Sequence, residues 1–159
     1  MKTRLALLLF IIMFSKAMIG QQISKTEDGF YVNDKGDKYS GVYISYYKDG
    51  GKETVYTVKN GKENGSVEFY YPSGEIMEQG FFKDGLKNGK WIRWSNNGNK
   101  LAEAYYNKGL KDGKWIIWDE RGIKRYEMYY TNGAKTGTWL MWDEKGQMSN
   151  KKDYKNSTD

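Results

Sequence analysis

Hydrophobic and polar positions alternate in short blocks along most of the chain, and the order of these blocks repeats. Residues 89–112, GKWIRWSNNGNKLAEAYYNKGLKD, and residues 113–136, GKWIIWDERGIKRYEMYYTNGAKT, have the same pattern of residue types place for place. Related units begin at Gly41 and Gly65, and a last one begins at Gly137, so the period is 24 residues. Such internal repetition is typical of a protein assembled from stacked supersecondary units.

Each unit predicts two short β-strands joined by a turn. Apolar and β-forming residues follow the opening glycine, as in 90–94, and return in the second half of the unit, as in 101–106. Gly, Asn, Asp and Ser lie between these runs, which is the pattern of a β-hairpin, and no spacing of i, i+3, i+4 and i+7 favours a helix. Since a lone hairpin is marginally stable in water, the units must pair edge to edge. The predicted fold is all-β: an open, single-layer antiparallel sheet of about five 24-residue hairpin repeats, twisted and preceded by a short cap.

Glycines recur in three columns with this period. The first column opens the units, and we expect its members to be turn glycines: Gly41, Gly65, Gly89, Gly113 and Gly137. The second column holds Gly50, Gly74, Gly98, Gly122 and Gly146, and the third holds Gly61, Gly85, Gly109 and Gly133. Asn97-Gly98, Asn132-Gly133, Asp84-Gly85 and Asp49-Gly50 are dipeptides that tolerate the positive φ of tight hairpin turns.

Aromatic residues form columns as well, counted from each opening glycine as position one. We expect a structural aromatic ladder from positions three and eighteen, which include Tyr43, Trp91, Trp115, Trp139, Phe82, Tyr106 and Tyr130. Position six holds Tyr46, Tyr70, Trp94, Trp118 and Trp142. In a regular strand, positions three and six point to opposite faces, unless a bulge re-aims one set. Position six is therefore the candidate binding face, because large exposed apolar patches mark contact sites; packing between neighbouring units is the simpler explanation of both columns.

The first 20 residues predict a secretory signal peptide. A basic start and an unbroken apolar run from Leu5 to Phe14 precede small residues that suit cleavage. A membrane anchor would need about 20 apolar residues, and Lys16 ends the run earlier. We therefore expect an exported protein, located in the periplasm or outside the cell. The expected domains are a signal peptide (1–20), a capping hairpin (21–40), the repeats (41–156) and a tail (157–159).

Charge argues against a nucleic-acid partner. The chain has 26 basic and 20 acidic residues, and removal of Lys2, Arg4 and Lys16 with the signal peptide leaves 23 against 20. Lysines alternate with acidic residues along each unit instead of forming one basic patch. The chain has no cysteine, so its stability must come from the stacked core and not from disulfides.

Catalysis is not indicated. Histidine and cysteine are both absent, which removes the usual general base, the thiol nucleophile and the soft metal ligands. Asp119-Glu120 and Asp143-Glu144 are adjacent carboxylates of the kind that bind calcium or flank a glycosidic bond. Both pairs fall in expected turns next to basic residues, and turn chemistry explains them better. We expect no enzyme, no metal and no cofactor.

The repeat resembles the bacterial variant of the MORN repeat, a family of β-hairpin arrays with the pattern G-x-W-x-x-W/Y. Gly89-Lys90-Trp91-Ile92-Arg93-Trp94 and Gly113-Lys114-Trp115-Ile116-Ile117-Trp118 carry the resemblance most clearly, and it extends over residues 41–154. The first two units lack Trp, and the last unit lacks its final glycine. The resemblance implies an open repeat sheet that acts as a scaffold for protein or membrane contacts; some bacterial members are labelled antitoxins.

The leading functional hypothesis is an exported, non-catalytic scaffold that binds another protein, or its own copy, through an aromatic face or an edge strand. Cell-wall or glycan binding by stacked Trp and Tyr is the first alternative, and antitoxin-like neutralisation of a partner is another. Peripheral contact with anionic lipid headgroups is a weaker one, based on the surplus of lysine.

Overall fold

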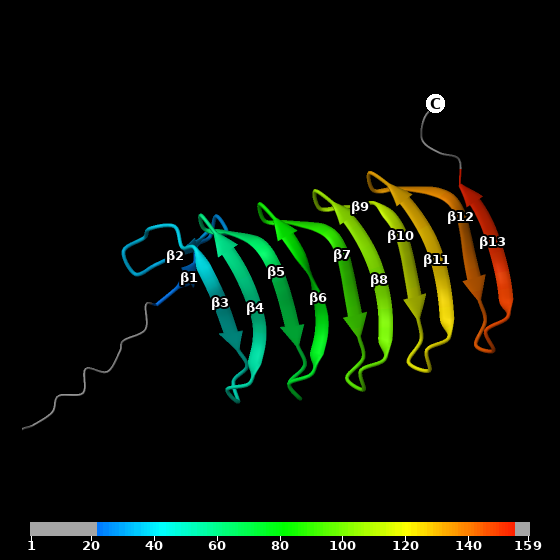
Figure 1. Cartoon of the computed structure of the whole chain (residues 1–159), viewed down its shortest axis with the longest axis horizontal. Helices are drawn as coiled ribbons and strands as arrows, with labels where there is room; N and C mark the ends of the chain where they lie inside the picture. Colours follow the sequence, from blue (N-terminus) through cyan, green and yellow to red (C-terminus); the bar gives the residue numbers. More distant parts are fainter. Residues whose placement is uncertain (1–21, 155–159) are drawn as a thin grey trace, which may run out of the picture.

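The computed structural model describes residues 22–154, which form strands and turns without a helix (Figure 1). The expected signal peptide (1–20) and tail (157–159) lie outside the described residues. Within residues 22–154 there is no helix long and apolar enough to cross a membrane. The strands are β1 (Ser24–Lys25), β2 (Tyr31–Val32), β3 (Gly41–Tyr46), β4 (Lys52–Lys59), β5 (Lys62–Tyr70), β6 (Ile76–Lys83), β7 (Leu86–Trp94), β8 (Lys100–Asn107), β9 (Leu110–Lys111), β10 (Gly113–Trp118), β11 (Lys124–Thr131), β12 (Ala134–Trp142) and β13 (Met148–Tyr154).

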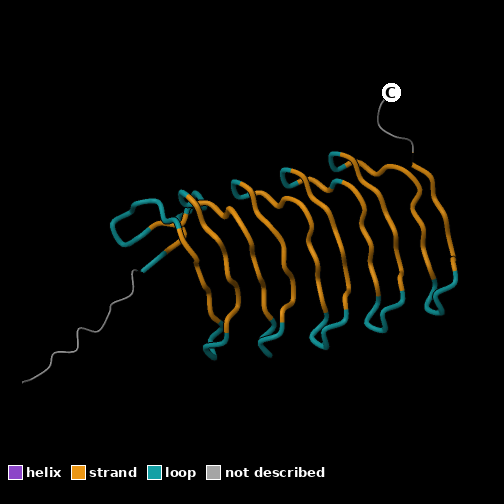
Figure 2. Tube along the Cα trace, viewed as in Figure 1, coloured by secondary structure: helices purple, strands orange, loops and turns teal. Residues whose placement is uncertain are grey.

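One long antiparallel sheet dominates the structure. Its order follows the chain, from β3 at one edge to β13 at the other, and the short β9 pairs with β8. The strands succeed one another along the longest axis of the molecule, and turns lie along both long sides (Figures 1 and 2). The prediction of an open sheet built from successive hairpins is therefore confirmed.

The two sides of the sheet use different turns. On one side the turn dipeptides have left-handed φ at both residues, as a type I′ hairpin requires. These dipeptides are Asn60-Gly61, Asp84-Gly85, Lys108-Gly109 and Asn132-Gly133, with φ from 49° to 85°. On the other side the turns are longer, and within Asp49-Gly50 and Asn97-Gly98 only the glycine has positive φ. The expectation of tight turns thus holds for Asp84-Gly85 and Asn132-Gly133 but not for these two dipeptides.

The opening glycines need a correction, because the structure places them in strands and not in turns. All five have positive φ, and they lie inside β5, β7 and β12 or begin β3 and β10: Gly41, Gly65, Gly89, Gly113 and Gly137. The strand pairing is irregular beside them. Gly89, Lys90 and Trp91 together lie opposite the single residue Gly80 of β6. Each unit therefore bends at a strand irregularity that needs a residue without a side chain.

The sheet has two distinct faces, as the parity of the columns predicts. Trp91 pairs with Ala104, and Trp94 pairs with Lys100 beyond a bulge that follows Arg93. This bulge recurs in every unit and leaves positions three and six on opposite faces. We call the face that carries Trp91 the ladder face and the face that carries Trp94 the position-6 face.

The core lies on the ladder face and is densest at its centre. Val67, Trp91 and Ala104 are buried there, and Trp91 is only 2% exposed. At the N-terminal end, β1 pairs with β2 and brings Tyr31 over the first rungs, with its ring centroid 4.8 Å from that of Tyr43. The backbone amide of Tyr31 donates to the carbonyl of Gly61, so the cap is attached to the first two-residue turn.

Candidate binding surfaces

Aromatic rings on the ladder face form an unbroken series from the cap to the last strand. Neighbouring ring centroids are 4.7 to 6.4 Å apart, mostly in tilted or edge-to-face arrangements. Such geometry suits the quadrupoles of the rings and stabilises each pair by about 0.5–1.5 kcal/mol beyond burial. The rings are those of Tyr31, Tyr43, Tyr56, Phe69, Phe82, Trp91, Tyr106, Trp115, Tyr130, Trp139 and Tyr154. All residues expected in the structural ladder belong to this series.

A lysine column lies over the ladder, with one member in each of three successive units. The Nζ of Lys87 is 3.7 Å from the ring centroid of Trp91, that of Lys111 is 4.3 Å from Trp115, and that of Lys135 is 4.7 Å from Trp139. Each ammonium group also lies 4.9 to 5.4 Å from the ring centroid of a tyrosine, Tyr106, Tyr130 or Tyr154, which belongs to the same unit as the contacted tryptophan. These cation–π contacts hold the charges close to the sheet.

The three ladder tryptophans differ in their hydrogen bonds. The indole Nε1 of Trp115 donates to the carbonyl of Tyr105 at 2.9 Å, and that of Trp139 donates to the carbonyl of Tyr129 at 3.0 Å. The Nε1 of Trp91 is buried without a partner among the described residues. Trp91 instead packs against Gly80, where an added Cβ would lie 2.2 Å from its ring. The indole of Trp91 therefore lacks the hydrogen bond that Trp115 and Trp139 make, but it is more deeply buried than either.

On the position-6 face, tryptophans and lysines alternate across the strands. Trp94 pairs with Lys100, and the Nζ of Lys100 lies 5.7 Å from the ring centroid of Trp118. Trp118 in turn pairs with Lys124, whose Nζ lies 4.2 Å from the ring centroid of Trp142. The same row continues toward the N-terminus through Tyr70 and Tyr46, so the structure brings the five candidate binding residues into one row.

Two carboxylates neutralise the lysines around Trp94 and Trp118. Glu127 binds the ammonium groups of Lys114 and Lys124 at 3.0 and 2.9 Å and accepts a hydrogen bond from the hydroxyl of Tyr129. Although desolvation opposes the shift, these hydrogen bonds lower the pKa of Glu127 to about 2. Glu103 holds Lys90 and Lys100 in the same way, at 3.1 and 3.2 Å.

The tyrosines of the row are held less uniformly. The hydroxyl of Tyr70 donates to Glu68 Oε2 at 2.6 Å, and this bond, with burial, raises the pKa of Tyr70 to about 12. Tyr46 is 58% exposed. Trp94, Trp118 and Trp142 are each partly exposed.

Exposed apolar side chains concentrate on the position-6 face. Strand pairing assigns six of the seven large, exposed hydrophobic residues among residues 22–154 to this face and only Tyr126 to the ladder face. The six are Val42, Tyr46, Phe81, Leu86, Leu110 and Met148. The distribution distinguishes a face that buries its own rings from a face that leaves apolar surface open to solvent.

Both edges of the sheet have features that discourage pairing with another chain. At the β3 edge the hydroxyl of Tyr39 donates to the carbonyl of Val42 and lies against Gly41. At the other edge, β13 is exposed except for partly buried Tyr154 and carries Lys151 and Lys152. Lysine on an edge strand discourages pairing with another chain. The faces are therefore better contact surfaces than the edges.

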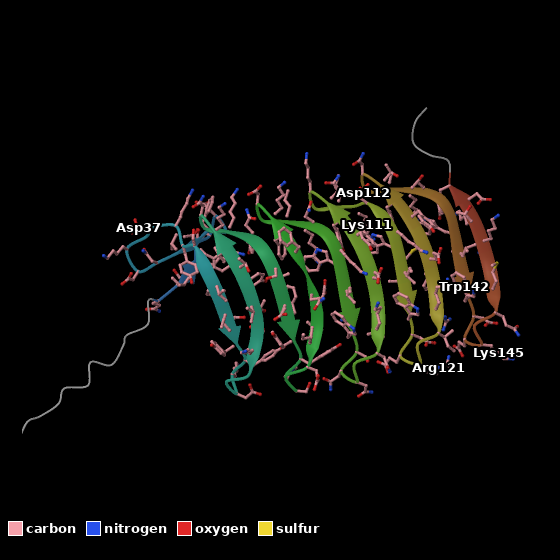
Figure 3. The ribbon with its side chains drawn as sticks, in the orientation of Figure 1. Asp37, Lys111, Asp112, Arg121, Trp142 and Lys145 are labelled. Carbon is pink, nitrogen blue, oxygen red and sulfur yellow. The ribbon has the colours of Figure 1, made fainter. Side chains whose placement is uncertain are left out.

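The adjacent carboxylates have structural roles in turns. Asp119 Oδ1 accepts hydrogen bonds from the backbone amides of Arg121 and Ile123. Asp143 Oδ1 likewise accepts hydrogen bonds from the backbone amides of Lys145 and Gln147. Desolvation would raise the pKa of Asp119, but these bonds and the Arg121 guanidinium lower it overall. Arg121 and Lys145 lie at this end of the units, and Lys111 and Asp112 lie at the opposite end (Figure 3). No cluster of three potential metal-ligating residues occurs within residues 22–154.

These features define a class of protein: a repeat scaffold in which each hairpin adds two strands to one sheet. The family model described as "MORN repeat variant" matches residues 63–84, 87–108, 111–132 and 135–156, which is more than half of the chain. The chain belongs to the MORN-repeat variant family, a non-catalytic repeat module. Each of the first three matched segments spans one hairpin, such as β5 and β6. A search of curated proteins finds no match to this chain.

Sequence reasoning missed the lysines as part of both surfaces. Lys100 and Lys124 occupy equivalent places in successive units, as do Lys87, Lys111 and Lys135. Their shared repeat position was the available signal. Only the strand pairing and the ring contacts showed that Lys100 and Lys124 lie between tryptophans, and that Lys87, Lys111 and Lys135 lie over the ladder.

Proposed function

We propose that the protein is an exported, non-catalytic scaffold that binds a protein partner through its position-6 face. The observation that carries the proposal is the gathering of exposed apolar side chains on this face, beside partly exposed Trp94, Trp118 and Trp142. Trp and Tyr join an apolar body to a polar tip, and they are enriched where proteins associate. The ladder face buries its aromatic rings within the molecule and has less apolar surface to offer.

Protein is the favoured partner because of the charges around the row. Glu103 and Glu127 balance the neighbouring lysines, so this surface combines an apolar centre with charges of both signs. A nucleic acid or an anionic membrane would be favoured by unbalanced positive charge. Lys124 also occupies one face of the Trp142 ring, which reduces the area on which a sugar could stack.

The face can be tested by site-specific photo-crosslinking in the native envelope. A photo-reactive amino acid at Phe81, on the position-6 face, is expected to give a discrete adduct with a stoichiometric partner, which mass spectrometry identifies. The matched position is Tyr126 on the ladder face, because the two side chains are 43% and 41% exposed. Capture from position 126 but not from position 81 would refute the assignment of the face.

A triple variant tests the tryptophans themselves. Replacement of Trp94, Trp118 and Trp142 by alanine is expected to abolish the Phe81 adduct, while Tyr126→Ala leaves it intact. Circular dichroism of both variants establishes whether the sheet is retained. If the protein instead sediments with wall polysaccharide and captures no protein, the glycan alternative replaces the proposal.

A further inference from the structure

The ladder face carries unbalanced positive charge in the C-terminal part of the sheet. From β7 to β13, strand pairing places cations and no carboxylate on this face. Among the cations, Lys87 is bound by Glu78 of β6 at 2.9 Å. Lys111 and Lys135 have ring contacts and no ion pair within the described residues. This differs from the position-6 face, where Glu103 and Glu127 each bind two lysines.

The spacing of the lysine column follows from the repeat. Lys87, Lys111 and Lys135 lie on β7, β9 and β12, one hairpin apart. One hairpin advances the sheet by two strand spacings, about 9.5 Å. A polyproline II helix has three residues per turn and rises about 9.3 Å in that turn. A chain in this conformation, laid across the strands, would therefore present every third side chain to successive lysines.

We propose that the lysine column of the ladder face binds an extended acidic polypeptide segment, with an acidic residue at every third position. Its carboxylates pair with Lys111 and Lys135, and Lys87 extends the site toward the centre of the sheet. This site is separate from the surface proposed for the main partner, because it lies on the opposite face of the sheet.

The geometry of the ammonium groups favours a peptide over a lipid surface. The Nζ of Lys111 lies 4.3 Å from the Trp115 centroid and 4.9 Å from the Tyr130 centroid, and Lys135 repeats the arrangement on the next unit. These charges are drawn back onto the sheet instead of projecting from it. A narrow chain that lies on the sheet reaches them more readily than a flat bilayer does. Lys111 lies near the two-residue turns, away from Arg121 and Lys145 (Figure 3).

The spacing is tested with two labelled peptides of equal composition and charge. In the first, the triplet Pro-Pro-Glu repeats along the peptide, and in the second all glutamates are gathered at one end. Fluorescence anisotropy with the mature protein at low salt is expected to give a Kd at least about tenfold lower for the spaced peptide. Equal Kd values for the two peptides, or binding of neither, would overturn the proposal.

Matched variants of the protein then locate the site. Lys111→Gln with Lys135→Gln should raise the Kd of the spaced peptide about tenfold, since each removed charge contributes modestly. Lys48→Gln with Lys145→Gln removes the same charge from the longer turns, which lie at the opposite ends of the strands from the two-residue turns near Lys111. This variant should change the Kd by less than about twofold. Equal losses in the two double variants would show a general charge effect and contradict the assigned site.

Vesicles and the crosslinking experiment separate the remaining outcomes. Binding to phosphatidylserine vesicles that is lost in the Lys111 and Lys135 variant, without peptide binding, would assign the column to a membrane surface and overturn the peptide proposal. The Phe81 adduct is expected to persist in this variant. Its loss would show that the two faces do not act separately.

Discussion

Among the glycines of the described residues, Gly80 is the one where an added Cβ would come closest to a neighbouring atom. An ideal Cβ there would lie 2.2 Å from Cδ2, 2.3 Å from Cε2 and 2.7 Å from Cε3 of Trp91. Carbon atoms pack best at about 3.5–4.0 Å, so the indole would have to move by about 1 Å. Phe82 contacts the same ring at a centroid distance of 5.1 Å, and Trp91 is 2% exposed, which leaves it little room. The φ of Gly80 is not in the left-handed region, so the cost is steric.

Overpacking of a well-ordered core typically costs 1–3 kcal/mol. Because the Trp91 ring is rigid and buried, we expect Gly80→Ala to lower the free energy of unfolding by about 3 kcal/mol. Urea unfolding followed by circular dichroism measures the change. The control is Gly51→Ala, at a second glycine without left-handed φ, whose nearest neighbour is a flexible carboxylate oxygen 3.3 Å from the added Cβ; it should cost less than about 1 kcal/mol. Adding Trp91→Val should relieve part of the loss, because the two sites are in contact. Similar costs for Gly80→Ala and Gly51→Ala would refute the packing argument.

Three further predictions concern the ladder, a turn and a charge network. Trp91→Ala, at a side chain that is 2% exposed, should lower the free energy of unfolding by about 3–5 kcal/mol, and Tyr154→Ala, at the last rung, by much less; equal losses in urea unfolding would contradict a core that is densest mid-array. Lys108 has φ 49° in a two-residue turn, and asparagine adopts left-handed φ more readily than lysine. Lys108→Asn should therefore increase the free energy of unfolding by roughly 0.5–1 kcal/mol and raise the melting temperature; an unchanged or lower melting temperature would contradict this. The pKa of Glu127 lies at about 2 when folded against 4.5 ordinarily, so its stabilisation is present above about pH 4.5 and is lost as the pH falls toward 2. Glu127→Gln should therefore cost roughly 1–2 kcal/mol at pH 6 and progressively less in unfolding curves below pH 4.5; a pH-independent difference would contradict the network.

The face assignment shows how far repeat sequence alone can reach. Trp91 and Trp94 lie three residues apart, and the period of two in a strand places them on opposite faces. The bulge that follows Arg93 does not reverse this parity, because it inserts its extra residue into the neighbouring strand. The prediction therefore survived a distortion that the sequence does not reveal.

The opening glycines show where the same reasoning failed. Gly65 and Gly89 look like turn residues in the sequence because each follows a polar block that contains asparagine. In the structure they lie inside β5 and β7, at positive φ beside irregular pairing. Glycine marks a conformation that other residues avoid, and both turns and strand irregularities require such a conformation.

The sequence by itself determined the period, the hairpins, the antiparallel order and the family, because all of these depend on neighbours within one or two units. Only the tertiary structure showed that Lys100 lies between two tryptophans, that Lys111 lies over two rings without a carboxylate, and that Trp91 packs against Gly80. These features join residues from different strands, and their distances depend on register, bulges and side-chain direction. Local patterns determine which elements form, and pairing between elements determines which surfaces they create.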